Sequence, residues 1–217
     1  MTFKSNAQLV QEKYLKILYS EKEWAKCKED KTEQMLVLKS SIDIERLIVE
    51  RKARVRNLRT HLHQSLLLLP KFLTRKEFLP LVTNFCNSDL FWEYKGRTLE
   101  ENFCFYLIKQ NELNGPLQDL AKIDGILIGL GSNSKAPSPW GNSNYPSSSI
   151  ENDKDDSSVI FEEFETLYGF DIERILEGSF TNIDEIKEEP GIIQVSIEED
   201  GETFITYAPY VTEGDHE

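Results

Sequence analysis

The sequence predicts an α+β protein, with an N-terminal all-helical domain followed by a polar linker and a small antiparallel C-terminal sheet of about three strands. Charge divides the chain: its 217 residues carry a net −13, but residues 1–131 carry +4 and residues 132–217 carry −17. Apolar residues recur at helical spacing in the first segment and alternate in the last. We therefore expect a helical domain (1–131), a linker (132–158) and a β-rich domain with an acidic tail (159–217).

Periodicity predicts the first two helices. Apolar residues at helical spacing indicate one amphipathic helix over residues 6–26. A second is expected over residues 41–69, where Pro70 ends it. The apolar stripe of this second helix is formed by Val55, Leu58, Leu62, Leu66 and Leu69.

Capping signals predict the next three helices. Thr74 and Glu77 have the spacing of a capping box before an apolar run, and so do Thr98 and Glu101. A further helix begins at Pro116, since proline suits a first helical position, and Gly129 and Gly131 end it.

The β-rich domain is predicted from a hairpin. Ile193, Val195 and Ile197 alternate with polar residues, Asp200-Gly201 is a turn signal, and residues 204–207 form the return strand. A turn centred there places Ile197 opposite Phe204 and Val195 opposite Thr206. Because a lone hairpin is marginally stable, a third strand is needed. Residues 170–180 are the candidate, although Ile172, Ile175 and Leu176 also fit one face of a helix, and both alternatives stay open at this point.

Between the two, residues 132–158 contain nine serines and three prolines. This composition buries too little apolar surface to fold alone, so we expect a linker.

The sequence contains few residues that could carry out chemistry. His61 and His63 point about 200° apart on a helix, and no nucleophile–base motif or phosphate loop is present. The three cysteines form no CxxC pair and are expected to be reduced thiols. No apolar run is long enough to span a bilayer and no secretory signal is seen, so we expect a cytoplasmic protein with no membrane contact. We expect no catalytic residue and no bound metal or cofactor in this chain.

One helix carries a basic cluster, formed by Arg46, Arg51, Lys52, Arg54, Arg56 and Arg59. It could bind phosphates or an acidic protein surface. The alternative is a solvated helix face with Glu45 and Glu50 as partners. The acidic second half of the chain opposes binding to nucleic acid.

Four segments in order resemble one family: RNLRTHL at 56–62, PKFLTRKEF at 70–78, LEENFCFYL at 99–107 and PLQDLAKIDG at 116–125. Together they resemble the helical domain of MbnC-like companion proteins from methanobactin biosynthesis, whose relatives are often labelled as DNA-binding. The resemblance covers residues 45–131 well and residues 169–208 loosely. It implies a non-catalytic subunit that binds an MbnB-like TIM-barrel oxidase and presents the leader of a precursor peptide to it. The iron lies entirely in that partner, which converts cysteines of the peptide to oxazolone and thioamide groups in an O2-dependent, four-electron reaction.

The resemblance also implies that residues 171–180 form the first strand, and we adopt that expectation against their periodicity. A free sheet edge would then capture the leader peptide by β-augmentation. The residues expected to bind the peptide are Ile172, Arg174, Leu176, Ile193, Val195, Ile197, Phe204 and Tyr207. Contact with the oxidase is expected at Arg51, Arg54 and Arg59. The acidity of the β-rich domain predicts a leader peptide that carries lysine or arginine.

Two other functions are considered. A nucleic-acid-binding regulator would use the basic helix and bind duplexes with a steep dependence on salt. A general interaction adaptor, like the partner of a toxin, would need no precursor peptide.

Overall fold

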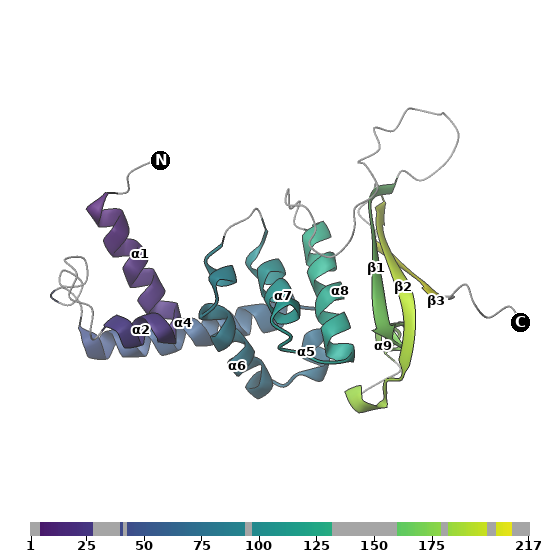
Figure 1. Ribbon diagram of the computed structural model, residues 1–217, viewed down its shortest axis with the longest axis horizontal. Coiled ribbons are helices and arrows are strands. Elements are labelled where there is room, and N and C mark those ends of the chain that lie inside the picture. Colours follow the sequence, from purple (N-terminus) through teal and green to yellow (C-terminus); the bar gives the residue numbers. More distant parts are fainter. Residues whose placement is uncertain are drawn as a thin grey trace, which may run out of the picture. The chain divides into compact units, whose positions relative to one another are not determined.

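The computed structural model describes residues 5–27, 40, 43–93, 97–131, 160–178, 182–198 and 203–209 (Figure 1). Helices followed by a three-stranded antiparallel sheet confirm the predicted α+β class. The chain forms two compact units: unit 1 is Met1–Ser65 with Leu73–Glu93, and unit 2 is Leu66–Phe72 with Tyr94–Glu217. The last two helices before residue 131 therefore belong with the sheet, and the units do not coincide with the predicted division at that residue. The linker 132–158 lies outside the described residues.

Unit 1 contains α1 (Asn6–Tyr19), α2 (Glu21–Cys27), α4 (Ile44–Ser65), α6 (Arg75–Cys86) and the 3-10 helix η1 (Asp89–Phe91). One part of its core joins α1, α2 and α4 through Ile17, Leu18, Cys27 and Leu47. A second part joins α4 and α6 through the buried side chains of Leu58, Leu62, Phe78, Val82 and Phe85. The capping box at Thr74 and Glu77 is confirmed at the start of α6.

The expected helix over 6–26 is interrupted at Ser20, which is extended (φ −98°, ψ 121°). The Ser20 hydroxyl accepts a hydrogen bond from the Glu23 N–H at 3.2 Å, so Ser20 caps α2. Serine followed three residues later by glutamate is a capping signal in the sequence, and it marks this break.

The long helix ends earlier than predicted. α4 stops at Ser65, and Pro70 lies in the first turn of a short helix, α5 (Leu69–Phe72), instead of ending the long one. Proline is tolerated in a first turn because the N–H that it lacks has no helical partner there. The backbone N–H groups of Leu67, Leu68 and Leu69 donate instead to the Asp124 carboxylate.

In unit 2, α5 packs with α8 (Pro116–Gly131), which packs against α7 (Leu99–Lys109). The predicted capping box at Thr98 and Glu101 is confirmed at the start of α7. Gly129 lies inside α8 and does not end it. A Cβ at this position would come within 2.8 Å of the Glu101 Oε1 atom of α7. The glycine therefore allows the close approach of α7 and α8.

The sheet of unit 2 has the order β1-β2-β3, from β1 (Ile160–Phe170), β2 (Glu188–Glu198) and β3 (Thr203–Pro209) (Figure 1). Helix α9 (Ile172–Leu176) and the 3-10 helix η2 (Ile183–Glu185) connect β1 to β2. The expectation of a first strand over 171–180 is therefore wrong, because the first strand lies immediately before it. The helical spacing of Ile172 and Ile175 predicted this segment correctly, and both side chains are buried.

Candidate functional site

The sheet offers two outer edges for a peptide strand. β2 is central and pairs with both neighbours, so β1 and β3 are the edge strands of the described sheet. An edge strand presents unpaired N–H and C=O groups, which can hydrogen-bond to an added strand. The two edges differ in what lies beside them.

The edge of β1 is partly occupied by α8. The Gly169 N–H donates to Asp119 Oδ2 at 2.8 Å, where the pairing of β1 with β2 is irregular. Burial raises the pKa of the Asp119 carboxyl, and its hydrogen bond to Gly169 opposes that rise. A carboxylate that accepts from a strand N–H takes the place of a strand carbonyl, so this end of β1 is already capped.

The edge of β3 carries an exposed apolar side chain. β3 pairs with β2 so that Val195 lies opposite Ile205 and Ile193 opposite Tyr207. Ile193 and Val195 are fully buried, and Ile205 and Tyr207 are half-buried on the same face. The opposite face carries Phe204, which is 41% exposed, together with the exposed Thr206 and Gln194.

The predicted hairpin register is wrong by one residue. Phe204 pairs with Ser196 and not with Ile197, and Ile197 pairs with Thr203. A one-residue shift moves every side chain of a strand to the other face. Both faces of β3 contain apolar residues, so alternation alone could not select the register. The expected Asp200-Gly201 turn and the side chain of Ile197 lie outside the described residues.

Three of the residues expected in a strand lie in α9. Ile172 is buried, Leu176 is half-buried, and Arg174 is exposed and pairs with Asp171 at 3.4 Å. Asp171 also caps the helix by accepting from the Arg174 N–H. Because their backbone is helical, Ile172, Arg174 and Leu176 cannot hydrogen-bond to a peptide as strand residues.

Burial and nearby carboxylates raise the pKa of Tyr207, the tyrosine of β3. Burial, and then the negative charges of Glu173 and Glu177, raise the pKa of Tyr207 to about 12. Burial and the charges of Glu173 and Glu189 likewise raise the pKa of Tyr168 in β1. Both tyrosines therefore remain neutral beside an acidic surface. A cationic side chain would be favoured there.

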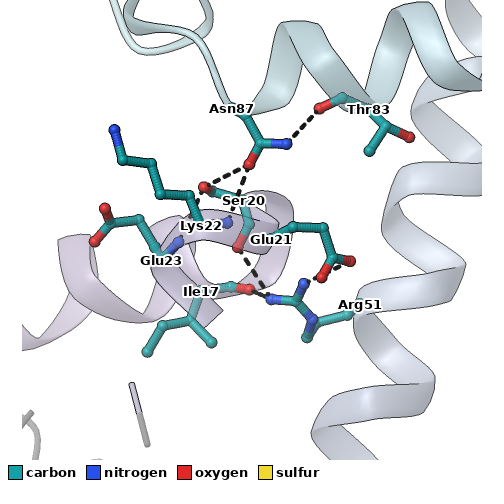
Figure 2. A network of polar contacts seen from close by, with 8 residues as sticks. All are labelled: Ile17, Ser20, Glu21, Lys22, Glu23, Arg51, Thr83 and Asn87. Atoms are coloured by element: carbon teal, nitrogen blue, oxygen red, sulfur yellow. Dashed lines mark hydrogen bonds and ion pairs between the residues drawn. The ribbon is translucent and has the colours of Figure 1, made fainter. Parts of the chain in front are cut away.

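The arginines expected to contact a partner lie in different environments on α4. Figure 2 shows the guanidinium of Arg51 at the junction of α1 and α2. It donates to the carbonyls of Ile17 and Ser20 and forms an ion pair with Glu21 at 3.0 Å. Arg51 is 6% exposed, and its guanidinium lies 4.9 Å from the centre of the Trp24 ring. Its hydrogen bonds hold the fold of unit 1.

A side-chain amide continues the same network (Figure 2). The Asn87 Oδ1 atom accepts from the Ser20 hydroxyl at 2.9 Å and from the Lys22 N–H at 3.2 Å. Its amide nitrogen donates to the Thr83 carbonyl. The start of α2 is thus tied to the end of α6.

Arg54 and Arg59 differ from Arg51 and from one another. Arg54 is exposed and pairs with Glu50 at 3.2 Å, and hydrogen bonds to Tyr19 and Glu50 raise its pKa. Arg59 is half-buried, and its Nε atom is buried without a hydrogen-bond partner in the described part of the chain.

Arg59 lines a cleft of about 400 Å³ in unit 1. Lys52 and Arg56 of α4 line it too, opposite Leu79 and Thr83 of α6. Lys52 and Arg56 belong to the basic cluster considered above for binding phosphates or an acidic surface, but contact with the oxidase was expected at Arg51, Arg54 and Arg59 instead. The spacing of Lys52 and Arg56 with Arg59 along one helix face is the signal that groups these three residues.

Within the described ranges, no group of three or more His, Cys, Asp or Glu side chains could hold a metal ion. Cys27, Cys86 and Cys104 are buried thiols that form no disulfide with one another. Burial raises the pKa of the Cys86 thiol to about 12 and that of Cys104 well above its usual range. Among the helices that the structure describes, none is long and apolar enough to cross a bilayer.

Comparison with known proteins identifies no relative: no protein-family model, curated protein or solved structure matches the chain.

Proposed function

We propose that this chain is the non-catalytic, peptide-presenting subunit of a heterodimeric, iron-dependent peptide oxidase of the methanobactin type. In this proposal a TIM-barrel partner carries the iron and oxidises cysteines of a precursor peptide. This chain binds the leader and positions those cysteines. The resemblance of residues 45–131 supports the family, and the observation that supports peptide binding is the outer edge of β3.

Two features favour β3 over β1 as the edge that takes the leader peptide. Asp119 already accepts from the Gly169 N–H at one end of β1. On β3, by contrast, Phe204 is exposed beside an outer edge that pairs with no strand among the described residues. A peptide strand added there would bury the phenyl ring of Phe204 and hydrogen-bond to the β3 backbone.

The surroundings of β3 specify the chemistry of the leader. The negative charges of Glu173 in α9 and of Glu177, which follows α9, raise the pKa of Tyr207. A peptide strand beside Tyr207 would therefore bind better with a lysine or arginine at that position. Because these carboxylates are exposed, binding should weaken as the salt concentration rises. A cytoplasmic location accompanies the proposal, since ribosomally made peptides are modified there.

The first experiment is co-purification of this chain with a TIM-barrel oxidase encoded beside its gene. We expect a stable pair that modifies the precursor peptide faster than the oxidase alone. If the two form no complex and the oxidase alone works at full rate, the proposal is wrong.

The second experiment tests the mode of peptide binding with a fluorescent leader and fluorescence anisotropy. Alternate residues of an added strand point their N–H groups toward β3. N-methylation of one alternating set of peptide residues should therefore abolish binding, and N-methylation of the other set should not. Equal effects from both sets would contradict β-augmentation.

A matched pair of variants locates the edge. Thr206→Lys places a positive charge on the exposed face of the edge strand, and Gln194→Lys places it at the paired position of the central strand. The leader cation beside Tyr207 would lie on the other face of the sheet, so the added lysine would act through the net positive charge of the leader. Thr206→Lys should weaken binding roughly threefold and Gln194→Lys less, because residue 194 lies one strand further from the added strand. Equal weakening by both would exclude the β3 edge.

A further inference from the structure

A cleft on unit 1 has no role in the proposed peptide capture by the sheet. It has a volume of about 400 Å³ and lies between α4 and α6. Lys52, Arg56 and Arg59 contribute from α4, and Leu79 and Thr83 contribute from α6. The two walls come from helices that share a buried core, so the cleft is part of the folded unit.

The cations of this cleft are available for a ligand. The acidic residue that lines it, Glu21, is paired with Arg51. The side chains of Lys52 and Arg56 are exposed and form no hydrogen bond or ion pair with any described residue. The Nε atom of Arg59 is buried without a hydrogen-bond partner in the described ranges.

The three cations lie in a row along the wall of the cleft that α4 forms. Lys52, Arg56 and Arg59 are separated by four and then three residues, so they lie along one face of α4. At 1.5 Å per residue, they span roughly 10 Å of the helix. Leu79 and Thr83 are four apart on α6 and run along the facing wall.

The apolar part of the lining narrows the class of ligand. Leu79 is 39% exposed, and Val55 is half-buried between the cations. A glutamate presents a carboxylate at the end of an aliphatic stem, so it can contact both kinds of surface. A nucleic-acid strand would gain little from Leu79 and Val55. Repulsion by a chain of net −13 also grows with the charge of the ligand.

We infer that this cleft binds an acidic segment of a partner protein, with two or three carboxylates spaced to meet Lys52, Arg56 and Arg59. The site is separate from the sheet edge and does not depend on peptide capture there. Each carboxylate would form a charge-assisted hydrogen bond with one of the three cations, and the aliphatic stems would lie against Leu79.

The test uses the full chain and a short, fluorescein-labelled helical peptide whose glutamates repeat the spacing of Lys52, Arg56 and Arg59. Its control is the same peptide with glutamine at those positions. Fluorescence anisotropy should show binding of the glutamate peptide, weakening with salt, and at least roughly tenfold weaker binding of the glutamine peptide. Absence of binding to the glutamate peptide at low ionic strength would overturn the inference.

Variants of the protein assign the binding to the cleft. Lys52→Gln and Arg56→Gln remove exposed charges from its lining, and each should weaken binding by roughly threefold to tenfold. Arg46→Gln is the matched control, because Arg46 is exposed on the same helix and does not line the cleft. It should leave the affinity within about twofold. Equal weakening by Arg46→Gln would show diffuse attraction and overturn the site.

A competing ligand provides the last check. A single-stranded oligonucleotide should bind more weakly than the glutamate peptide at the same salt concentration. Tighter oligonucleotide binding that is lost on Arg56→Gln would make the cleft a nucleic-acid site and overturn the inference. Circular dichroism of each variant separates loss of binding from loss of fold.

Discussion

Each of the two units of this protein has a buried charged side chain that hydrogen-bonds to backbone groups at a helix end. Helix ends leave backbone groups without helical partners. In unit 1, Arg51 donates to the carbonyls of Ile17 and Ser20, where α1 ends. In unit 2, Asp124 accepts from the N–H groups of Leu67, Leu68 and Leu69, where α5 begins. A cation thus completes a C-terminus, and an anion completes an N-terminus.

The two sites differ in how their charge is balanced. Arg51 has an ionic partner, Glu21, and its ring contact with Trp24. Asp124 is fully buried, and its hydrogen bonds come from three backbone N–H groups. Desolvation by burial raises the pKa of Asp124 to about 6, and the three hydrogen bonds and the charge of Lys71 oppose that rise. The charge of the Asp124 carboxyl therefore changes with pH near neutrality.

The largest expected effect comes from Asp124→Ala. It leaves the buried N–H groups of Leu68 and Leu69 without an acceptor and makes a cavity between α5 and α8. The free energy of unfolding should fall by about 4 kcal/mol at neutral pH. Urea denaturation measures the loss. Hydrogen exchange should show that the amides of Leu67–Leu69 lose their protection before those of α4.

A loss below about 1 kcal/mol, with the three amides still protected, would show that water replaces the carboxylate. That result would contradict the role assigned to Asp124.

Arg51→Met should have a smaller effect. It removes the donor for two carbonyls, but methionine still covers Trp24, and Glu21 is 66% exposed and becomes solvated. Unsatisfied carbonyls are tolerated better than unsatisfied N–H groups. We expect the free energy of unfolding to fall by about 3 kcal/mol. The fluorescence of Trp24 and Trp92 reports the unfolding. A loss equal to or greater than that of Asp124→Ala would reverse the proposed order.

The comparison also shows which features local sequence could predict. The capping boxes at Thr74 and Thr98 and the proline start of α8 depend on neighbours in the chain, and the structure confirms them. The backbone of residues 67–69, where α5 begins, depends on Asp124, which lies more than fifty residues further along the chain. No local pattern contains that information. The resemblance and the helical spacing disagreed at α9, and the local spacing was correct.

The candidate sites likewise have features that depend on neighbours in the chain and features that depend on distant residues. The basic cluster on α4 was evident, but its members have different roles because α1, α2 and α6 surround that helix. The inward position of Arg51 was predictable, since it lies four residues before Val55 on the apolar stripe of the helix. The hairpin was expected, but its register was not, because both faces of β3 are apolar enough to be buried.

A smaller effect is expected in the pH dependence of the free energy of unfolding, to which Asp124 contributes. The pKa of Asp124 is about 6 in the folded chain, against 3.8 for an ordinary aspartate. Between these values the folded state holds a proton that the unfolded state has lost. The part of the stability that comes from protonating Asp124 is therefore fully present below pH 3.8 and is lost as the pH rises through about 6, while the hydrogen bonds of Asp124 to the backbone remain.

We expect this loss to be about 2 kcal/mol between pH 4 and pH 7. The measurement compares the pH profile of urea unfolding with that of Asp124→Asn, which does not titrate. Other carboxylates contribute alike to both profiles, so the difference isolates Asp124. Parallel profiles would exclude a raised pKa at this residue.

The smallest expected effect is that of Glu21→Gln. It removes the ionic partner of Arg51 and leaves the guanidinium bonded to Ile17 and Ser20. Because Glu21 is exposed, water already weakens the ion pair, and the free energy of unfolding should change by at most about 0.5 kcal/mol. Urea denaturation of Glu21→Gln beside Arg51→Met makes the comparison. If the glutamine variant lost as much stability as the methionine variant, Arg51 would act through its ion pair, and its likeness to Asp124 as a partner of backbone groups would not hold.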